Sequence, residues 1–295
     1  MQDVQSLAGS TSVEEAVRAA DAAAAAAGVQ IRMIDELEEI EAVHQLFTDI
    51  WRPAVEGSLM PTELLRALST AGSYVSGAYD GTRLVGACVG LFGPPAERKM
   101  HSHIAGVSAS VRRRGVGFAL KQHQRGWARQ AGVTTIAWTF DPLIAANARF
   151  NLAKLGARVE GYHPNFYGPM NDGFNAGQDS DRLLVHWQLD SPAVAAAGTG
   201  TLLELDPEQE SAAGAGIALG RAENGRPVTG SVDAPTVLVA LPTDLARMRA
   251  EDPQGVREWR VALRDTLTTL LTEGATVTGF ARGGWYVVDR TKGTS

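Results

Sequence analysis

The 295-residue sequence is poor in cysteine and aromatic residues and has no long hydrophobic run. Its one cysteine, Cys88, lies in the apolar stretch LVGACVGLF, so no disulfide framework or cysteine-based zinc site can form within the chain. This pattern predicts a buried structural thiol and a reducing compartment. No uncharged apolar run reaches membrane-spanning length, so we predict that the protein has no membrane partner.

Positive charge is also scarce, because 27 lysine and arginine residues face 33 aspartate and glutamate residues, a formal net charge of −6. This balance argues against nucleic acid as a partner. The alanine-rich stretch 13–27 is interrupted by Glu14, Glu15 and Asp21 and lacks a basic start, so it predicts a surface helix rather than an export signal. We therefore expect a cytoplasmic protein.

The most informative stretch is 101–130, HSHIAGVSASVRRRGVGFALKQHQRGWARQ. Residues 101–108 have the β-branched and small residues of a strand. From Gly115 onward, apolar residues recur at helical spacing (Val116, Ala119, Leu120, Trp127), and polar residues fall on the other faces (Lys121, Gln122, Arg125, Arg129). The pattern predicts a strand that runs through an arginine- and glycine-rich turn into an amphipathic helix.

This turn is a candidate phosphate-binding site. A helix start leaves backbone N–H groups without acceptors and carries the positive end of the helix dipole. Glycines let an anion approach closely, and arginine side chains add matching charge. The alternative is a solvated turn. A nicotinamide-type loop is excluded, because no third glycine follows Gly117 at the required spacing.

The spacing Arg112-x-x-Gly115-x-Gly117, after Val107-x-Ala109, resembles the signature of the GNAT acetyltransferase superfamily, with alanine in place of the usual proline. The resemblance implies acetyl-CoA or another acyl-CoA as co-substrate and no metal. It also implies a set of cofactor-binding residues: Val107, Arg112, Arg113, Arg114, Gly115, Val116 and Gly117. In 147–157, NARFNLAKLGA, it adds Asn147 and Phe150.

The predicted elements follow the superfamily's order. They are strands at 29–34, 74–79, 84–92, 101–108, 134–140 and 182–189, with helices at 37–51, after Pro61, after Gly115 and at 146–155. The strings at 101–103, 138–143 and 162–167 resemble a bacterial branch of predicted acetyltransferases with a C-terminal extension. We therefore predict a mixed α/β sheet of the GNAT acyl-CoA N-acyltransferase fold.

Four segments are predicted: a helical extension at 1–28, the acyltransferase domain at 29–192, a linker at 193–235 and a C-terminal extension at 236–295 that packs on the core. The linker contains one expected strand at 202–205. The extension predicts a β-α-α-β-β order, with its main helix at 256–271. Trp259, Arg260 and Arg264 on that helix indicate packing and surface ion pairs.

The general GNAT mechanism implies direct attack of an amine on the acyl thioester. The backbone N–H of Val107 corresponds to the donor that stabilises the developing oxyanion. Strand alternation predicts His101, His103, Ala105 and Val107 on one face, which makes His103 a candidate base; a histidine bonded within the sheet is the alternative. Asp141 is a second candidate base or amine anchor, or simply ends its strand.

The tyrosine acid common in the family is replaced by Leu152, and Tyr162 or Tyr167 from the following loop could substitute for it, although an acid is helpful rather than obligatory. The oxygen-rich run 171–181 indicates turns rather than a calcium site. The expected function is acyl-CoA-dependent N-acyl transfer, most simply of an acetyl group, to a small-molecule amine. Transfer from an acyl carrier protein, another acyl reaction, a non-catalytic acyl-CoA-binding role and a homodimer stay open.

Overall fold

The computed structural model describes residues 2–52, 59–168 and 178–291, with the backbone alone for 2–11. The described residues divide into two compact units. Unit 1 holds residues 2–52, 59–138 and 187–199, and unit 2 holds residues 139–168, 178–186 and 200–291. The division at residue 138 falls inside the predicted acyltransferase segment, so the domain boundaries at 192 and 236 stay a prediction.

The first sheet has seven strands in the order β1-β2-β3-β4-β5-β7-β6. Among the pairings whose register is described, only that of β4 with β5 is parallel. The strands are β1 (Gln30–Met33), β2 (Tyr74–Asp80), β3 (Arg83–Phe92), β4 (Lys99–Val107), β5 (Thr135–Phe140), β6 (Arg158–His163) and β7 (Arg182–Gln188). The predicted mixed sheet is confirmed, with every predicted strand within a few residues of its place.

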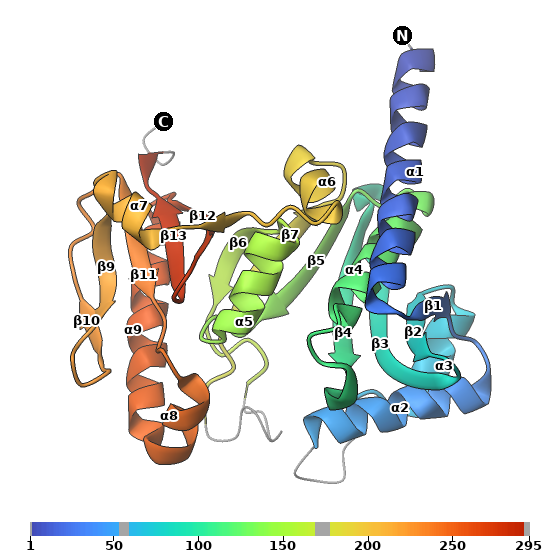
Figure 1. The fold of residues 1–295 in the computed structure, drawn as a ribbon, viewed down its shortest axis with the longest axis horizontal. Helices are drawn as coiled ribbons and strands as arrows, with labels where there is room; N and C mark the ends of the chain where they lie inside the picture. The colour runs from blue at the N-terminus through green and yellow to red at the C-terminus, as the bar shows by residue number, and fades with distance from the viewer. Residues whose placement is uncertain (1, 53–58, 169–177, 292–295) are drawn as a thin grey trace. The chain divides into compact units, whose positions relative to one another are not determined.

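The predicted helices also occur in the predicted order (Figure 1), and α6 is an additional helix where the linker was expected. They are α1 (Gln2–Ala27), α2 (Leu37–Trp51), α3 (Thr62–Thr70), α4 (Val116–Gln130), α5 (Ala145–Ala148) with the π-helix Arg149–Lys154 that continues it, and α6 (Pro192–Gly198). Two short 3-10 helices lie at Pro95–Glu97 and Ala109–Val111. The π-helix contains Leu152, which is buried.

The core of unit 1 lies on both faces of the sheet. Helices α2 and α3 pack on one face, where Ile40, Phe47 and Leu65 meet Val75 and Val89 of the sheet in one apolar cluster. Such burial contributes about 1.5–3 kcal/mol for each large side chain. On the opposite face, α4 packs on the sheet and α1 lies alongside α4 (Figure 1).

The polar side of α4 departs from the prediction. Lys121, Gln122 and Arg125 were expected on exposed faces of an amphipathic helix, yet all three are buried. Lys121 faces the sheet, where its ammonium contacts Ser102 of β4 and the Trp138 ring of β5. Gln122 and Arg125 lie on the opposite side of α4, against Gly198 of α6, and Gly126 lies against the α1 backbone. Amphipathic spacing cannot reveal such a second cover.

Unit 2 contains a six-stranded sheet with the order β10-β9-β11-β13-β12-β8. Its elements are β8 (Glu204–Leu205), α7 (Pro207–Ala212), β9 (Gly216–Arg221), β10 (Pro227–Thr229), β11 (Thr236–Ala240), α8 (Leu245–Glu251), α9 (Pro253–Thr272), β12 (Thr276–Ala281) and β13 (Trp285–Asp289). The β-α-α-β-β order is confirmed. The segment 193–235, predicted as a linker with one strand, also supplies α7, β9 and β10, and β9 is held by pairing with β10 and β11.

Helix α9 is the main packing element of unit 2. It contacts β9, β10 and β11 of the second sheet and β6 of the first. Trp259, Leu263 and Leu267 are buried on it, and the Trp259 indole N–H donates to the Gly225 carbonyl at 2.9 Å. Arg260 is 2% exposed, so its predicted surface ion pair is instead a buried one.

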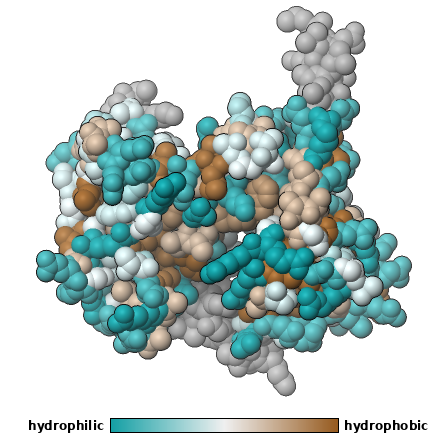
Figure 2. All heavy atoms as spheres, in the orientation of Figure 1, coloured by the Kyte–Doolittle hydropathy of each residue, from teal (hydrophilic) through white to brown (hydrophobic). Residues whose placement is uncertain are grey.

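The surface of the described residues is mixed in polarity. Figure 2 shows hydrophilic and hydrophobic residues interspersed on the visible face. Large exposed hydrophobic side chains are spread over separate elements, including Leu64 on α3, Ile217 on β9 and Val261 on α9. Within the described part of the chain, no helix is long and apolar enough to cross a membrane.

Gly106 of β4 gives a test of the core of unit 1. A Cβ atom there would lie 2.8 Å from Ile50 Cδ1 and 2.9 Å from the Trp51 ring, closer than carbon atoms pack. We expect Gly106→Ala to lower the free energy of unfolding by about 1–3 kcal/mol. Gly117→Ala is the control, since its Cβ would meet nothing nearer than 3.7 Å. Urea unfolding measures both, and equal stabilities would contradict this packing.

Candidate active site

The turn between β4 and α4 has the backbone shape of an anion cradle. A 3-10 turn at Ala109–Val111 follows β4, and the chain then takes positive φ at Arg113 (67°) and Gly115 (88°) before α4 begins at Val116. Successive residues of alternating handedness turn their N–H groups toward one side. A Cβ at Gly115 would meet no atom within 4 Å, so the space beside this residue is open.

The backbone N–H groups of this turn fall into two classes. Those of Val111, Arg112 and Arg114 donate to carbonyls three residues earlier in the chain. Those of Arg113, Gly115, Val116 and Gly117 have no acceptor among the described residues. Four donors beside open space at the positive end of a helix can bind an anion such as a diphosphate. We call residues 112–117 the cradle.

The three arginines of the cradle differ in their contacts. The Arg114 guanidinium donates to Asp80 at 2.6 Å and to the carbonyls of Ala27 and Gly28 at 3.2 Å, so it is held by the protein. Arg112 and Arg113 are exposed and have no ion pair within the described residues. These two side chains are therefore the cradle arginines that can turn to a ligand.

The edge of β4 next to the cradle lacks a strand partner. The register joins β4 to β5 only at Lys99, Met100 and His101, within the described chain. The Ser108 N–H donates to the Val85 carbonyl of β3 at 2.8 Å. Because N–H groups of successive strand residues point to opposite sides, that of Val107 points away from β3 toward this unpaired edge. Its direction suits an oxyanion donor.

A β-bulge in β4 corrects the predicted alternation. Val89 pairs with Ile104 and Gly90 with Ser102, so His103 is an extra residue without a partner on β3. A bulge reverses the faces of the residues beyond it. His101, opposite Leu91, therefore lies on the α2 face, whereas Val107 packs against Gly117 of α4. The common face predicted for His101, His103 and Val107 was wrong.

The two histidines nevertheless lie close together. Their ring centroids are 6.1 Å apart. Burial lowers the pKa of His101, and His103 and Lys121 lower it further. Burial also lowers the pKa of His103. Both imidazoles are accordingly neutral at pH 7 and can accept a proton.

Lys121 lies beside Ser102 and Trp138, the residues that follow the paired parts of β4 and β5. Its ammonium donates to Ser102 Oγ at 3.0 Å and Gln124 Oε1 at 2.8 Å, and it lies 3.8 Å from the Trp138 ring centroid. Burial lowers the pKa of Lys121 to about 8. Sequence patterns did not indicate this buried amine, because a lysine at helical spacing usually faces solvent.

The other predicted catalytic residues belong to unit 2. Asp141 is buried and accepts from Arg260 Nη1 and Nη2 at 3.2 and 3.0 Å and from the Leu143 N–H at 3.0 Å. A carboxylate held by a buried guanidinium gives up that pairing when it is protonated. These contacts favour a structural role for Asp141 over that of a base.

Two tyrosines were candidates for the acid. The Tyr162 hydroxyl donates to Asp181 Oδ2 at 2.6 Å, and burial followed by this hydrogen bond raises its pKa well above the ordinary range. Tyr162 therefore holds its proton too tightly to serve as an acid. Tyr167 is 45% exposed, and its hydroxyl lies 3.1 Å from Thr139 Oγ1.

Comparison with known proteins now bears on this geometry. Residues 40–156 match the model of the acetyltransferase (GNAT) family. They form a GNAT acetyltransferase domain. The match includes the cradle, β4 and α4, so the protein contains the domain of an acyl-transferring enzyme. No curated protein sequence matches the chain.

Solved structures with similar folds include three bacterial proteins. The ribosomal-protein-S18-alanine N-acetyltransferase of Escherichia coli is 14% identical, with 55% of this chain and 94% of that chain covered and a TM-score of 0.44. The putative acetyltransferase yncA of Salmonella typhimurium, solved with acetyl-CoA, is 18% identical, with 55% of this chain and 95% of that chain covered and a TM-score of 0.45. The ribosomal-protein-S5-alanine acetyltransferase of Vibrio fischeri is 16% identical, with 56% of this chain and 94% of that chain covered and a TM-score of 0.45.

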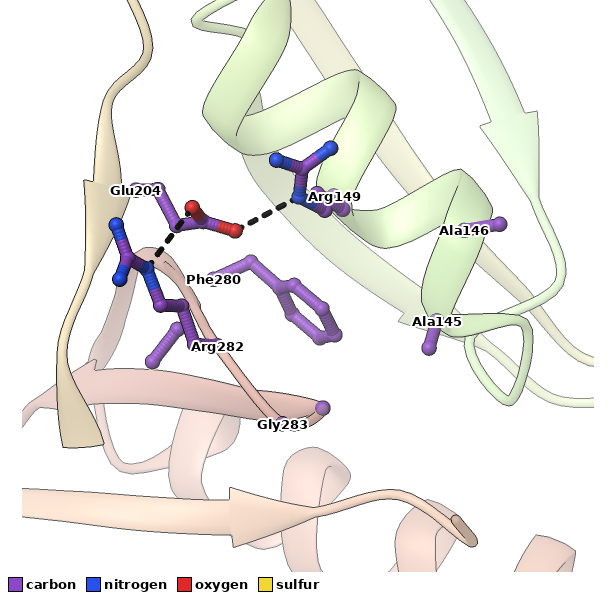
Figure 3. A pocket seen from close by; sticks show the side chains of 9 residues that line it. Ala145, Ala146, Arg149, Glu204, Phe280, Arg282 and Gly283 are labelled. Atoms are coloured by element: carbon purple, nitrogen blue, oxygen red, sulfur yellow. Dashed lines mark hydrogen bonds and ion pairs between the residues drawn. The ribbon is translucent and has the colours of Figure 1, made fainter. Parts of the chain in front are cut away.

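The GNAT residues predicted on α5 belong to unit 2. Asn147 is exposed and Phe150 is partly exposed on the adjoining π-helix. Neither lines the cavity of about 350 Å³ that lies beside α5. Figure 3 shows the Glu204 carboxylate between Arg149 and Arg282, with the Phe280 ring pointing toward α5. Two cations and one anion give this cavity an excess of positive charge.

Two further expectations concern metal binding. Within the described ranges, no group of three or more histidine, cysteine, aspartate or glutamate residues could hold a metal ion. Most of the oxygen-rich run 171–181 lies outside the described residues. Asp179 and Asp181 at its end are described, and both bind Arg264. Their positive partner is an arginine rather than a cation from solution.

The first prediction from the GNAT cradle concerns Arg112. We expect Arg112→Glu to weaken acyl-CoA binding about 100-fold, because a charge-assisted hydrogen bond is lost and a repulsive charge is added. Calorimetry with acetyl-CoA measures the affinity. Arg18→Glu is the control, since Arg18 is an exposed residue of α1 paired with Glu14. Equal affinities in the Arg112 variant and wild type would contradict the cradle assignment.

The second prediction concerns Lys121. Because its pKa of about 8 lies below the ordinary 10.5, the unfolded chain binds more protons between these pH values. Stability should therefore rise with pH from 8 to 10.5, by up to about 3 kcal/mol relative to Lys121→Met. Urea unfolding of both proteins across that window measures the difference. Parallel pH dependences would show that Lys121 titrates normally.

Proposed function

We propose that this protein is an acyl-CoA-dependent N-acyltransferase that moves an acetyl group to the amine of a small molecule. The observation that carries the proposal is the set of four N–H groups at Arg113, Gly115, Val116 and Gly117 that lack acceptors among the described residues, inside a GNAT domain. Backbone donors at a helix start suit the diphosphate of a CoA thioester. The match to the family supplies the reaction class.

Binding of the thioester is assigned to unit 1. The cradle N–H groups would take the diphosphate, and Arg112 and Arg113 would turn their free guanidinium groups to it. Arg114 contributes charge while it stays bound to Asp80. The unpaired edge of β4 would take the extended arm of the ligand through backbone hydrogen bonds, as a neighbouring strand does.

The chemical step is direct attack of the amine nitrogen on the thioester carbonyl. A carbon–nitrogen bond forms, the carbonyl oxygen gains charge, and the carbon–sulfur bond then breaks with release of the CoA thiolate. The Val107 N–H is the proposed donor to that oxygen, because it points to the unpaired edge of β4. A fixed backbone donor of this kind contributes about 2.7–4 kcal/mol in other acyl-transfer enzymes.

His103 is the proposed base that removes the proton from the attacking ammonium. His103 is the extra residue of the bulge, so it does not follow the alternation of the other β4 residues. Its lowered pKa keeps the imidazole neutral at pH 7. The proposed acid is Tyr167, whose exposed hydroxyl bonds only to Thr139 among the contacts of the described residues. A thiol has a pKa of about 8.5, so the acid assists rather than enables departure of the thiolate.

Leu152 motivates an alternative. It is buried at the position where many family members carry the tyrosine acid. An enzyme without that acid could take its acyl group from a carrier-protein thioester or run another acyl reaction, and a non-catalytic acyl-CoA-binding module would need no acid. The donor and the acceptor are therefore the variables of the first experiment.

Thiol release from acetyl-CoA across a panel of small amines and a peptide amino terminus tests the proposal. We expect stimulation by a small amine and none by the peptide. Stimulation only by the peptide would overturn the small-molecule assignment. Absence of stimulation by any amine, with a thermal shift caused by acetyl-CoA, would favour the binding module. Activity with an acylated carrier protein alone would favour the carrier donor.

The pH profile tests His103. Since the pKa of His103 is lowered, wild-type kcat/KM should fall only at a pH below the ordinary 6.5 of histidine. His103→Ala should lower the plateau about 100-fold and flatten that acid limb. His186→Ala is the control, because His186 lies on β7 beside Glu160. An unchanged acid limb in the His103 variant would assign His103 to structure.

A further inference from the structure

We propose that Arg264 of helix α9 is a positioning residue for acyl transfer: through Asp181 it fixes the turn 164–168 that carries Tyr167. The inference rests on the proposed function, in which Tyr167 gives the proton to the leaving thiolate. It assigns the C-terminal segment a part in the reaction. All of the residues concerned lie in unit 2.

The link begins with a carboxylate fully removed from solvent. The Asp181 side chain is 0% exposed, and both of its oxygens are held by Arg264, Nε at 2.9 Å and Nη2 at 2.8 Å. Burial opposes the charged form of Asp181, but the hydrogen bonds from Arg264 and Tyr162 overcome it and lower the pKa. Asp181 is therefore a permanent anion whose counter-charge comes from the C-terminal helix.

Asp181 passes this constraint to the turn. The Tyr162 hydroxyl at the end of β6 donates to its Oδ2 at 2.6 Å, and the backbone N–H of Asn165 donates to its Oδ1 at 3.0 Å. Asn165 has positive φ (44°), a strained conformation that surrounding contacts must hold. One carboxylate thus fixes the strand end and the middle of the turn together.

Ser180, the neighbour of Asp181, completes the hold on Tyr167. Its Oγ accepts from the Tyr167 N–H at 2.9 Å and donates to the Gly168 carbonyl at 2.8 Å, and its carbonyl accepts from the Phe166 N–H at 3.0 Å. Every backbone donor from 165 to 168 is engaged, since Gly168 donates to the Asn165 carbonyl. The placement of the Tyr167 hydroxyl therefore depends on residues 180 and 181.

Removal of Arg264 would leave two carboxylates, Asp179 and Asp181, without their shared guanidinium. The Asp181 carboxylate would then keep the hydrogen bonds from the Tyr162 hydroxyl and the Asn165 N–H, while Arg260 still acts on it through its charge. A buried unpaired carboxylate attracts water or a proton, and either would displace the turn. The cradle contains none of these residues, so thioester binding should be unaffected.

The experiment compares Arg264→Met, Arg264→Lys and a matched control. Arg226→Met removes an arginine of similar exposure that pairs with Asp252 and with Glu258 on the same helix. We expect Arg264→Met to lower kcat about tenfold with an unchanged affinity for acetyl-CoA, Arg264→Lys to recover part of the loss, and the control to match wild type. A loss of acetyl-CoA affinity equal to the loss of kcat would overturn the proposal.

A double-mutant cycle with Tyr167→Phe separates positioning from general stability. If Arg264 acts through Tyr167, the double variant should be no slower than Tyr167→Phe alone. Independent, multiplying losses would overturn the inference.

Hydrogen exchange at the Asn165 and Tyr167 amides gives a readout without turnover, and Arg264→Met should lose protection there. Unchanged protection of these amides in Arg264→Met would refute the positioning role. If protection is lost but the wild-type protein shows no amine-dependent turnover, only the proposed function is refuted.

Discussion

Backbone amides that the protein leaves without acceptors are the constraint on which the rest of unit 1 depends. Gly115 makes this arrangement feasible, because its positive φ ends the arginine turn and starts α4 without a side chain in the open space. The sheet below then fixes where α4 starts. Val107 touches Gly117, and Gly86 lies against Val116 and Leu120, so small residues bring the helix close to β3 and β4.

In unit 2 the organising interactions are charges withdrawn from water. Asp141 and Asp181 are both buried, and each is held by arginines of the C-terminal segment. Replacement of such a pair by apolar residues is often neutral for stability, but loss of one partner is costly. Their value is geometric, since a bidentate guanidinium fixes distance and plane together. The C-terminal segment thereby shares ionic contacts with the end of β5 and the start of β7.

Patterns in the sequence were sufficient for the features that depend on neighbours along the chain. The start of α4 and the places of six strands of the first sheet follow from local periodicity and glycine position, whereas β6 was not predicted. Sequence patterns failed where the structure depends on residues far apart in the chain. The bulge at His103 depends on pairing with β3, the pairing of Arg114 with Asp80 joins residues far apart in the chain, and Asp141 looked free because Arg260 lies 119 residues later.

The burial of α4 on both sides illustrates the same limit. Nothing in its own spacing distinguishes a buried Gln122 or Arg125 from one in solvent, and only the cover by α6 does so. The strands β9 and β10 were likewise hidden, because β10 has only three residues and β9 gains its place by pairing with β10 and β11.

The hold of α1 on Arg114 has a practical consequence. The carbonyls of Ala27 and Gly28 accept from the same guanidinium that binds Asp80, so the last turn of α1 restrains an arm of the anion site. Shortening the protein from its amino terminus for crystallisation would remove these two acceptors and leave Asp80 to hold the guanidinium. Ligand affinities measured on such a truncated form would then not represent those of the whole chain.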